Sequence, residues 1–359
     1  MTATARELDA VRRAVELSRA ALGSTSPNPP VGAVVLDADG DVVGEGWTRP
    51  PGGPHAEVVA LQSAGPRARG GTAVVTLEPC RHTGRTGPCT TALIDAGIAR
   101  VVYACADPSS DAGGGAAVLR AAGVDVAQVL ADEVARGPLE AWLTSRATGR
   151  PFVTWKYAAT LDGRSAAADG TSRWITGEES RADVHRLRAE CDAVVAGVGT
   201  VLTDDPLLTA RPDPGHQPLR VVVDSRGRTP LTARALSGPR PAVVATRSDV
   251  DEGTYPDQLP LPGDDDGHVD LVALLQALAG RDLVSVLLEG GPTLAGAFVR
   301  QGLVDKVVGY VAPTLLGDGT AALQGAGVTT VSAAHRLRLD DVTRIGDDVR
   351  LTLRPHREA

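Results

Sequence analysis

Four residues in the first quarter of the chain have the types and spacing of a catalytic metal site. His55 and Glu57 lie two residues apart, and Cys80 and Cys89 each follow a proline. One imidazole and two thiolates are ligands that zinc prefers, and a site with three protein ligands leaves the fourth tetrahedral position to a water, as in catalytic zinc sites. We therefore predict that His55, Cys80 and Cys89 bind zinc and that Glu57 is the catalytic acid–base that exchanges protons with this water.

The local sequence around these residues supports the prediction. A Pro-Cys step places the thiol at the entry to a helix or tight turn, where free N–H groups and the helix dipole favour the thiolate. In the first turn of a helix, His55 and Glu57 can reach a common point. A His-x-Glu pattern followed by Pro-Cys is typical of zinc nucleobase deaminases. Here eight residues separate Cys80 from Cys89, where that pattern has two.

The elements that must position these residues alternate along the first half of the chain. Strand-like apolar runs and helical segments follow one another, which favours an α/β layer with a largely parallel or mixed sheet. The predicted strands cover 31–36, 41–46, 73–77, 101–104 and 124–129, and the predicted helices cover 1–22, 57–63, 88–96, 116–122 and 131–146.

The second half repeats this alternation after a break at Thr148-Gly149-Arg150-Pro151. A chain of 359 residues is long for one core, so we predict two domains, 1–147 and 148–359. Asp, Gly and Pro dominate 249–268, which is expected to be a surface loop. The predicted strands cover 152–158, 192–196, 219–223, 242–245, 284–288 and 306–311, and the helices cover 178–188, 271–279 and 292–301.

Composition excludes several classes of partner. A net charge of −8 and a pI near 5.4 argue against binding to nucleic acid. The sequence has no apolar run near the roughly 18 residues that a membrane span needs. Two of the four cysteines are assigned to zinc, and Cys105 and Cys191 are expected to be buried thiols, which fits a reducing cytoplasm.

Two glycine turns between a strand and a helix stand out in the second half. They occupy 194–200 and 287–296, and Pro292 in the second is suited to a first helical position. Glycine lets the backbone approach a phosphate, and the N–H groups at a helix start attract anions. Either turn is also explained by ordinary strand–helix geometry. A Gly-x-Gly-x-x-Gly fingerprint with a distal acid is lacking, which disfavours a Rossmann domain.

The run Glu78–Cys89, with Asn28-Pro29-Pro30-Val31-Gly32 upstream, resembles the deaminase half of the RibD family of bifunctional riboflavin-pathway enzymes, whose cysteines have this longer spacing. The resemblance implies a cytidine-deaminase-like αβα domain in which Asn28 contacts the pyrimidine and His82 and Arg85 line the same pocket. Thr48 and Ser109 depart from the family pattern, which usually has histidine and asparagine there. Both are expected on the ribose phosphate side of the substrate, where they bear on its affinity or identity.

Three further motifs, Lys156–Arg164, Ser172–Thr176 and Gly199–Arg211, resemble the reductase half of the same family, which has a dihydrofolate-reductase-like α/β fold. The resemblance covers nearly the whole chain and implies reduction of a ribosyl group, opened at C1′, to ribityl by NADPH. The residues implied for NADPH are Ala158, Trp174, Thr200, Asp204, Ser225, Gly291, Pro292, Thr293, Leu294, Ala295, Gly296 and Ala297, with Lys156 beside the cofactor; those implied for the substrate are Ser172, Arg188, Leu208, Arg211 and Glu289.

The predicted function is therefore a cytoplasmic, bifunctional enzyme with one zinc ion and NADPH. It would deaminate a phosphoribosylamino-pyrimidine and then reduce its ribosyl group, without a nucleic-acid or membrane partner and as a homo-oligomer, either dimer or tetramer. Two alternatives stay open. The deaminase half could be inactive or retuned to a related pyrimidine, or the zinc could be purely structural, in a binding scaffold with His82 as the fourth ligand.

Overall fold

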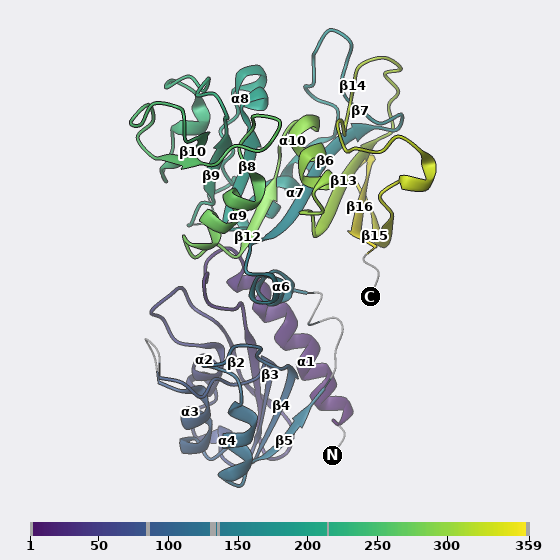
Figure 1. The fold of residues 1–359 in the computed structure, drawn as a ribbon. Helices are drawn as coiled ribbons and strands as arrows, with labels where there is room; N and C mark the ends of the chain where they lie inside the picture. The colour runs from purple at the N-terminus through teal and green to yellow at the C-terminus, as the bar shows by residue number, and fades with distance from the viewer. Residues whose placement is uncertain (1–2, 84–86, 130–133, 135–136, 214, 357–359) are drawn as a thin grey trace. The chain divides into compact units, whose positions relative to one another are not determined.

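A computed structural model describes residues 3–83, 87–129, 134, 137–213 and 215–356. The chain divides into two compact units, Met1–Gly149 and Arg150–Ala359, which are described separately below (Figure 1). In the described ranges, every helix is too short or too polar to cross a membrane.

The first unit is built on a mixed five-stranded sheet in the order β2-β1-β3-β4-β5. β1 is antiparallel to β2 and β3, whereas β3, β4 and β5 are parallel. The strands are β1 (Gly32–Leu36), β2 (Val42–Trp47), β3 (Thr72–Leu77), β4 (Arg100–Cys105) and β5 (Asp125–Gln128), and the helices are α1 (Ala5–Ser18), α2 (Ala56–Ala64), α3 (Cys89–Asp95), α4 (Gly115–Ala121) and α6 (Glu140–Thr148), with short 3₁₀ turns η1 (Arg19–Ala21) and η2 (Gly65–Ala68).

These elements confirm the alternation predicted for the first half of the chain. The predicted hairpin at 31–46 is present, with β1 and β2 antiparallel. The helix predicted over 131–146 falls partly outside the described residues, and α6 extends beyond its predicted end to Thr148. α6 then ends at Gly149, which adopts a left-handed conformation with φ 70°, favoured by glycine at a helix C-terminus.

Glycines in β1 and β2 allow two helices to pack directly on the sheet backbone. A Cβ at Gly32 would lie 1.9 Å from the carbonyl oxygen of Ala14 in α1. A Cβ at Gly46 would lie 2.4 Å from the carbonyl oxygen of Ala56 in α2. Since Gly46 is paired with Ala33, the residue after Gly32, the two glycines face opposite sides of the sheet. α1 and α2 therefore cover opposite faces, and this close packing fixes the start of α2.

The second unit contains a nine-stranded sheet in the order β11-β10-β9-β8-β12-β6-β13-β16-β15. The strands from β11 to β13 are parallel, and β16 and β15 are antiparallel additions at one edge. They are β6 (Phe152–Thr160), β8 (Ala193–Gly197), β9 (Leu219–Val223), β10 (Ala242–Arg247), β11 (Gln258–Leu261), β12 (Ser285–Leu288), β13 (Lys306–Ala312), β15 (Leu337–Ile345) and β16 (Asp348–Pro355).

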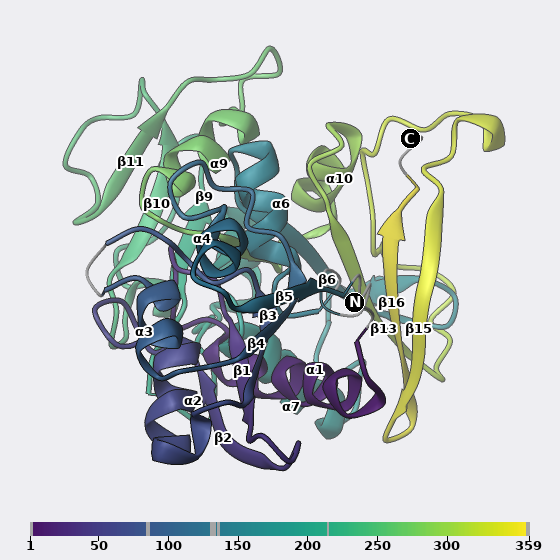
Figure 2. The ribbon, with the colours of Figure 1, turned by 90° about the horizontal axis from the view of Figure 1, so that it is seen from below.

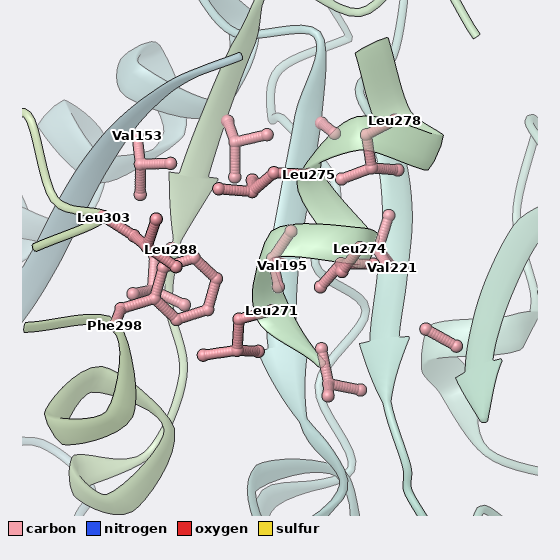
Figure 3. Close-up of a cluster of buried hydrophobic side chains, with 14 of the residues drawn as sticks. Val153, Val195, Val221, Leu271, Leu274, Leu275, Leu278, Leu288, Phe298 and Leu303 are labelled. Carbon is pink, nitrogen blue, oxygen red and sulfur yellow. The ribbon is translucent and has the colours of Figure 1, made fainter. Parts of the chain in front are cut away.

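Helices cover both faces of this sheet. The helices are α7 (Glu178–Ala189), α8 (Val198–Asp204), α9 (Leu271–Ala279) and α10 (Pro292–Arg300), with 3₁₀ turns η3 (Arg234–Leu236) and η4 (Val331–Ala333) and a small ribbon of β7 (Arg164–Ala166) and β14 (Thr320–Ala321). α9 and α10 insert Leu275 and Phe298 into the main core against the central strands (Figure 3). α7 and α8 contribute Val184 and Val201 to separate apolar clusters. Figure 2 gives a second view of these elements.

Two parts of the second unit differ from the sequence predictions. The segment 249–268 is not wholly a loop, because β11 extends the parallel sheet beside β10. The hairpin of β15 and β16 was not predicted. Every residue of β15 up to Arg344 is exposed, so the strand lacks the buried apolar face by which strands are recognised in a sequence.

Candidate active sites

Three separate segments of the first unit bring the predicted zinc ligands together. His55 caps α2, with Glu57 in the first turn of that helix. Cys80 follows the end of β3, and Cys89 is the first residue of α3. His55, Glu57, Cys80 and Cys89 are called the zinc cluster below.

The distances in the zinc cluster fit a tetrahedral metal. The ligand atoms of His55, Cys80 and Cys89 all lie within 4.8 Å of one another. His55 Nδ1 is 3.3 Å from Cys89 Sγ and 3.6 Å from Cys80 Sγ. Zinc bonds of about 2.1 Å to nitrogen and 2.3 Å to sulfur separate tetrahedral ligand atoms by about 3.6 Å. The cluster found among the described residues contains three ligands and does not include His82, which argues against the closed site of the scaffold alternative.

The two thiols interact so strongly that their proton affinities diverge. A hydrogen bond with Cys89, opposed by burial and reinforced by His55, lowers the pKa of Cys80 to about 4. The same contact with Cys80, together with burial, raises the pKa of Cys89. The backbone N–H of Cys89, at the start of α3, donates to Cys80 Sγ at 3.4 Å. One thiolate is thus stabilised by the protein itself, and a dication is needed to hold the second.

Glu57 has the environment of a group that exchanges protons. Its residue is 5% exposed, and burial, followed by the nearby charge of Cys80, raises the pKa of its carboxyl to about 6. A carboxyl whose pKa approaches neutrality can both accept and donate a proton at physiological pH.

Three members of the zinc cluster, His55, Glu57 and Cys80, lie in the wall of a cavity of about 400 Å³. Such a volume suits a small-molecule site. The residues lining it are Pro27, Asn28, Pro29, Val31, Thr48, Gly52, Gly53, His55, Glu57, Leu77, Glu78, Cys80, His82, Asp107, Ser109, Asp111, Ala112, Trp142 and Arg146.

The cavity brings most of the residues predicted for the deaminase substrate to one place. Asn28 and His82 both line it, as do Thr48 and Ser109, the two departures from the family pattern. The Thr48 hydroxyl accepts a hydrogen bond from the backbone N–H of Val31 at 3.1 Å, so it ties β1 to the chain after β2. Arg85 lies outside the described residues.

Trp142, Arg146 and Glu78 are among the cavity residues that were not predicted from the sequence. Trp142 and Arg146 come from α6, more than 100 residues after Asn28, and no local signal connects them to it. Glu78 stands beside the Pro-Cys motif and accepts hydrogen bonds from the backbone of Asp107 and Ala116. The carboxylate thereby positions the segment that carries Ser109. The acidic side chain of Glu78, two residues before the predicted zinc ligand Cys80, is the sequence feature by which it could have been predicted.

In the second unit, both predicted glycine turns lie at the carboxyl ends of neighbouring parallel strands. β8 leads through Gly197 into α8, and β12 leads through Gly291 into α10. A Cβ at Gly291 would lie 3.5 Å from Thr200 Oγ1, so the two turns are adjacent. The N-terminus of α10 begins with Pro292 and offers free N–H groups for an anionic cofactor. The residues there fit the pyrophosphate of NADPH.

Within the second turn, not every predicted cofactor residue is free to meet a ligand. Ala295 is fully buried in the main core. A Cβ at Gly296 would lie 1.7 Å from the carbonyl oxygen of Gln324, so packing against that segment explains this glycine. Thr293 is exposed, and Pro292, Leu294 and Ala297 are half-buried.

Three residues of the predicted reductase site form a second group of charges, called the reductase cluster: Lys156, Arg188 and Glu289. Arg188 donates to the two carboxylate oxygens of Glu289 at 2.5 and 2.8 Å, with the side chains only 12% and 8% exposed. Burial alone would raise the pKa of Glu289, but the charge and hydrogen bonds of Arg188 lower it below its ordinary value. Burial lowers the pKa of Lys156, and the charge of Glu289 opposes this.

Three further residues predicted for the reductase site are Ser172, Trp174 and Leu208. Ser172 donates to Asp204 Oδ1 at 3.2 Å, and the Trp174 ring is 70% exposed, with the Arg181 guanidinium 4.6 Å from its centroid. Leu208 is buried in an apolar cluster at φ 56°, so a ligand would reach its backbone.

Ala158, Ser225 and Arg211 complete the predicted set. Ala158 is half-buried on β6. The Ser225 hydroxyl accepts from the Val269 N–H at 3.0 Å. Arg211 is exposed. Burial, followed by the charges of Arg188 and Arg211, lowers the pKa of His185. His185, which was not predicted, contacts the Thr209 carbonyl through Nδ1 at 3.1 Å.

Family models match both units of the chain. The cytidine and deoxycytidylate deaminase zinc-binding region matches residues 5–105, which include the zinc cluster. The RibD C-terminal domain matches residues 151–351.

Full-length relatives cover both units together. The chain is similar to the riboflavin biosynthesis protein RibD of Mycobacterium tuberculosis, with 48% identity over 96% of each chain. It is similar to the solved structure of Acinetobacter baumannii RibD, with a TM-score of 0.88, 40% identity and coverage of 98% of this chain and 99% of that one.

A third similarity is to the diaminohydroxyphosphoribosylaminopyrimidine deaminase/5-amino-6-(5-phosphoribosylamino)uracil reductase of Thermotoga maritima, with a TM-score of 0.89 and 35% identity over 98% of this chain and 99% of that one. These similarities confirm the predicted fold class, a cytidine-deaminase-like αβα domain followed by a dihydrofolate-reductase-like domain. With its zinc cluster and its matches over both units, the chain belongs to the RibD family of bifunctional, zinc- and NADPH-dependent deaminase/reductases of riboflavin biosynthesis.

Proposed function

We propose that this chain deaminates 2,5-diamino-6-(5-phosphoribosylamino)pyrimidin-4(3H)-one to 5-amino-6-(5-phosphoribosylamino)uracil and then reduces its ribosyl group to ribityl. The observation that carries the first step is the convergence of three zinc ligands, two of which line the same cavity as the buried Glu57. The substrates are those named for the Thermotoga maritima relative.

In the deaminase half, His55, Cys80 and Cys89 would hold zinc, which when bound lowers the pKa of water toward about 7 and so supplies a nucleophile at neutral pH. Glu57 takes a proton from the attacking water and gives it to the amino nitrogen, which leaves as ammonia. Its raised pKa, about 6, suits both transfers. Asn28 and His82, both in the cavity wall, would orient the pyrimidine, with Arg85 as a further contact.

In the reductase half, NADPH supplies the hydride that is added to C1′ of the opened ribosyl group. Thr200, Asp204 and the turn from Gly291 to Ala297 would hold the cofactor, with Ala158, Trp174 and Ser225 as further contacts. Arg211 suits the substrate phosphate because a guanidinium can bind it through two parallel hydrogen bonds. Arg188, which already donates to Glu289 and to the Thr209 carbonyl, would contribute its remaining N–H groups. Ser172, Leu208 and Glu289 would complete the substrate site, with Lys156 on the cofactor side.

We further propose that residues 1–147 carry the deaminase and 148–359 the reductase, in the cytoplasm. The cytoplasmic assignment is supported by the four free cysteines, because zinc binding needs reduced thiols. A homo-oligomer, dimer or tetramer, is supported by the edge strand β15, which exposes Leu339 and Val342. Light scattering of the purified protein tests the oligomer directly.

A second candidate is a deaminase half that is inactive or acts on a related pyrimidine. It is favoured by the presence of both Thr48 and Ser109 in the cavity wall. The backbone hydrogen bond of Thr48 leaves its hydroxyl less available to a substrate than the histidine usual in the family would be.

One coupled assay separates these functions. The purified protein should contain one zinc per chain, release ammonia from the diamino pyrimidine, and consume NADPH only after that release. NADPH consumption with pre-deaminated substrate, but no ammonia release from the diamino compound, would favour the second candidate. Loss of both activities in a zinc-loaded, folded protein would contradict the proposed function.

A further inference from the structure

One wall of the deaminase cavity is formed by α6. Trp142 and Arg146 both line the cavity and are four residues apart, so they lie on the same face of the helix. The Arg146 guanidinium is 5.4 Å from the centroid of the Trp142 ring, within the range of a cation–π contact. The ring therefore restricts where the guanidinium can lie.

Trp142 is itself fixed in place. It is 2% exposed, and its Nε1–H donates to the carbonyl oxygen of Pro27 at 3.2 Å. Pro27 precedes Asn28, the residue proposed to contact the pyrimidine. The hydrogen bond thus ties α6, the helix that carries Arg146, to the loop that carries Asn28.

The charges of the cavity wall single out Arg146. The described lining residues include the carboxylates Glu57, Glu78, Asp107 and Asp111, and Arg146 is the one arginine or lysine among them. Across the part of the chain that the structure describes, Arg146 forms no ion pair with a carboxylate. An exposed guanidinium at an otherwise acidic cavity, without an internal counter-charge, is suited to bind an anion from solution.

The proposed substrate carries one strongly anionic group, its 5-phosphate. A phosphate would be repelled by the carboxylates near the zinc cluster and attracted to Arg146. We propose that Arg146, held by Trp142, binds this phosphate and so makes the deaminase half specific for the phosphorylated pyrimidine. The inference rests on the proposed function, because it takes its ligand from the deaminase substrate.

The test compares Arg146→Gln with wild type in the full-length, zinc-loaded protein, using ammonia release from the phosphorylated pyrimidine and from its dephosphorylated counterpart. With the phosphorylated compound, KM should rise about 10- to 100-fold, the usual range for losing a hydrogen bond to a charged group, with little change in kcat. With the dephosphorylated compound, KM should be the same in both proteins.

Arg69→Gln is the matched control, since it removes one exposed arginine of the same unit that does not line the cavity, and it should leave both KM values unchanged. Arg146→Lys keeps a charge without the guanidinium fork and should fall between wild type and Arg146→Gln. Inorganic phosphate should inhibit wild type competitively and Arg146→Gln more weakly. An unchanged KM for the phosphorylated compound, or an equal rise for both compounds, would overturn the proposal. Absence of ammonia release in wild type would instead contradict the proposed function itself.

Discussion

The zinc cluster and the reductase cluster are both buried groups of ionisable side chains, but they balance their charges in different ways. In the reductase cluster, Glu289 receives two hydrogen bonds from Arg188, so its charge is compensated inside the chain. In the zinc cluster, Cys80 is stabilised as a thiolate at the expense of Cys89. Holding both thiolates at once therefore needs a bound dication in the first unit, whereas the second unit compensates its buried carboxylate with its own residues.

The comparison also separates reactivity from stability. A buried pair such as Arg188–Glu289 is costly to break because the remaining charge has no partner. Glu57, by contrast, has no arginine or lysine beside it among the causes of its raised pKa, and the raised pKa leaves it able to gain and lose a proton. Substitution of Glu57 is expected to change the rate of ammonia release with little effect on stability. Substitution of Glu289, which is also proposed for the substrate site, is expected to lower the free energy of unfolding as well.

The largest effect is predicted for Glu57→Gln. Removal of the acid–base group should lower the rate of ammonia release by about 10²- to 10⁴-fold. Zinc content and reduction of pre-deaminated substrate should stay unchanged, because the three ligands and the second unit are intact. Metal analysis, ammonia release and NADPH consumption measure the three quantities. A variant that deaminates at the wild-type rate would contradict the role of Glu57.

The second effect is a loss of stability in Glu289→Gln. Neutralising one partner leaves Arg188 buried without its counter-charge, which should lower the free energy of unfolding by about 3–5 kcal/mol. Urea denaturation with pulse-labelling hydrogen exchange should show the change in β12 and β6 peptides and leave β3 peptides unaffected.

Asp347→Asn supplies the matched control for this change. It removes the partner of Arg344 from a pair whose side chains are 90% and 78% exposed, so solvent screens the charge and stability should hardly change. Equal destabilisation by the two variants would contradict the stabilising role assigned to the buried Arg188–Glu289 pair.

The third effect is predicted for removal of zinc, which should destabilise the first unit and leave the second unit unchanged. Removing zinc with a chelator should destabilise the first unit by about 2.7 kcal/mol if zinc had been present at 100 times its Kd, because the metal binds the folded site. Hydrogen exchange should accelerate in α2 and β3 peptides, while β8 and β12 peptides keep wild-type protection. Added zinc should restore the first unit. Equal loss of protection in both units would contradict the distinction between the clusters.

The residues of the zinc cluster could be predicted from local sequence patterns, whereas those of the reductase cluster could not. The zinc cluster was predicted because His55 and Glu57 share one helical turn and each cysteine follows a proline, so local patterns carry most of the information. The Arg188–Glu289 pair joins residues 101 positions apart, and only the resemblance placed both at one site. Trp142 and Arg146 had no signal at all, because they meet Pro27 and the cavity through tertiary packing.

The strands of the second unit also differ in how well the sequence predicts them. Buried strands such as β8, which is wholly apolar, and β9, which is apolar apart from Arg220, were both predicted almost to the residue. β11 and β15 lie at the two edges of the nine-stranded sheet, where neighbours on one side are missing and burial is low. Edge strands have less need of apolar residues, so their sequences resemble loops.

The smallest effect is predicted from the pH dependence of the reductase cluster. Because Arg188 lowers the pKa of Glu289 below its ordinary 4.5 despite burial, the folded protein holds this carboxylate ionised to lower pH than the unfolded chain does. The pair's contribution to stability is therefore complete above pH 4.5 and is lost as the pH falls through the lower, folded value. The stability difference between wild type and Glu289→Gln should shrink in that range, in urea denaturation read out by exchange pulses at one fixed labelling pH. The difference for Asp347→Asn should stay near zero throughout, and a wild-type advantage that is instead constant down to pH 3 would show that the substitution acts through packing, not through charge.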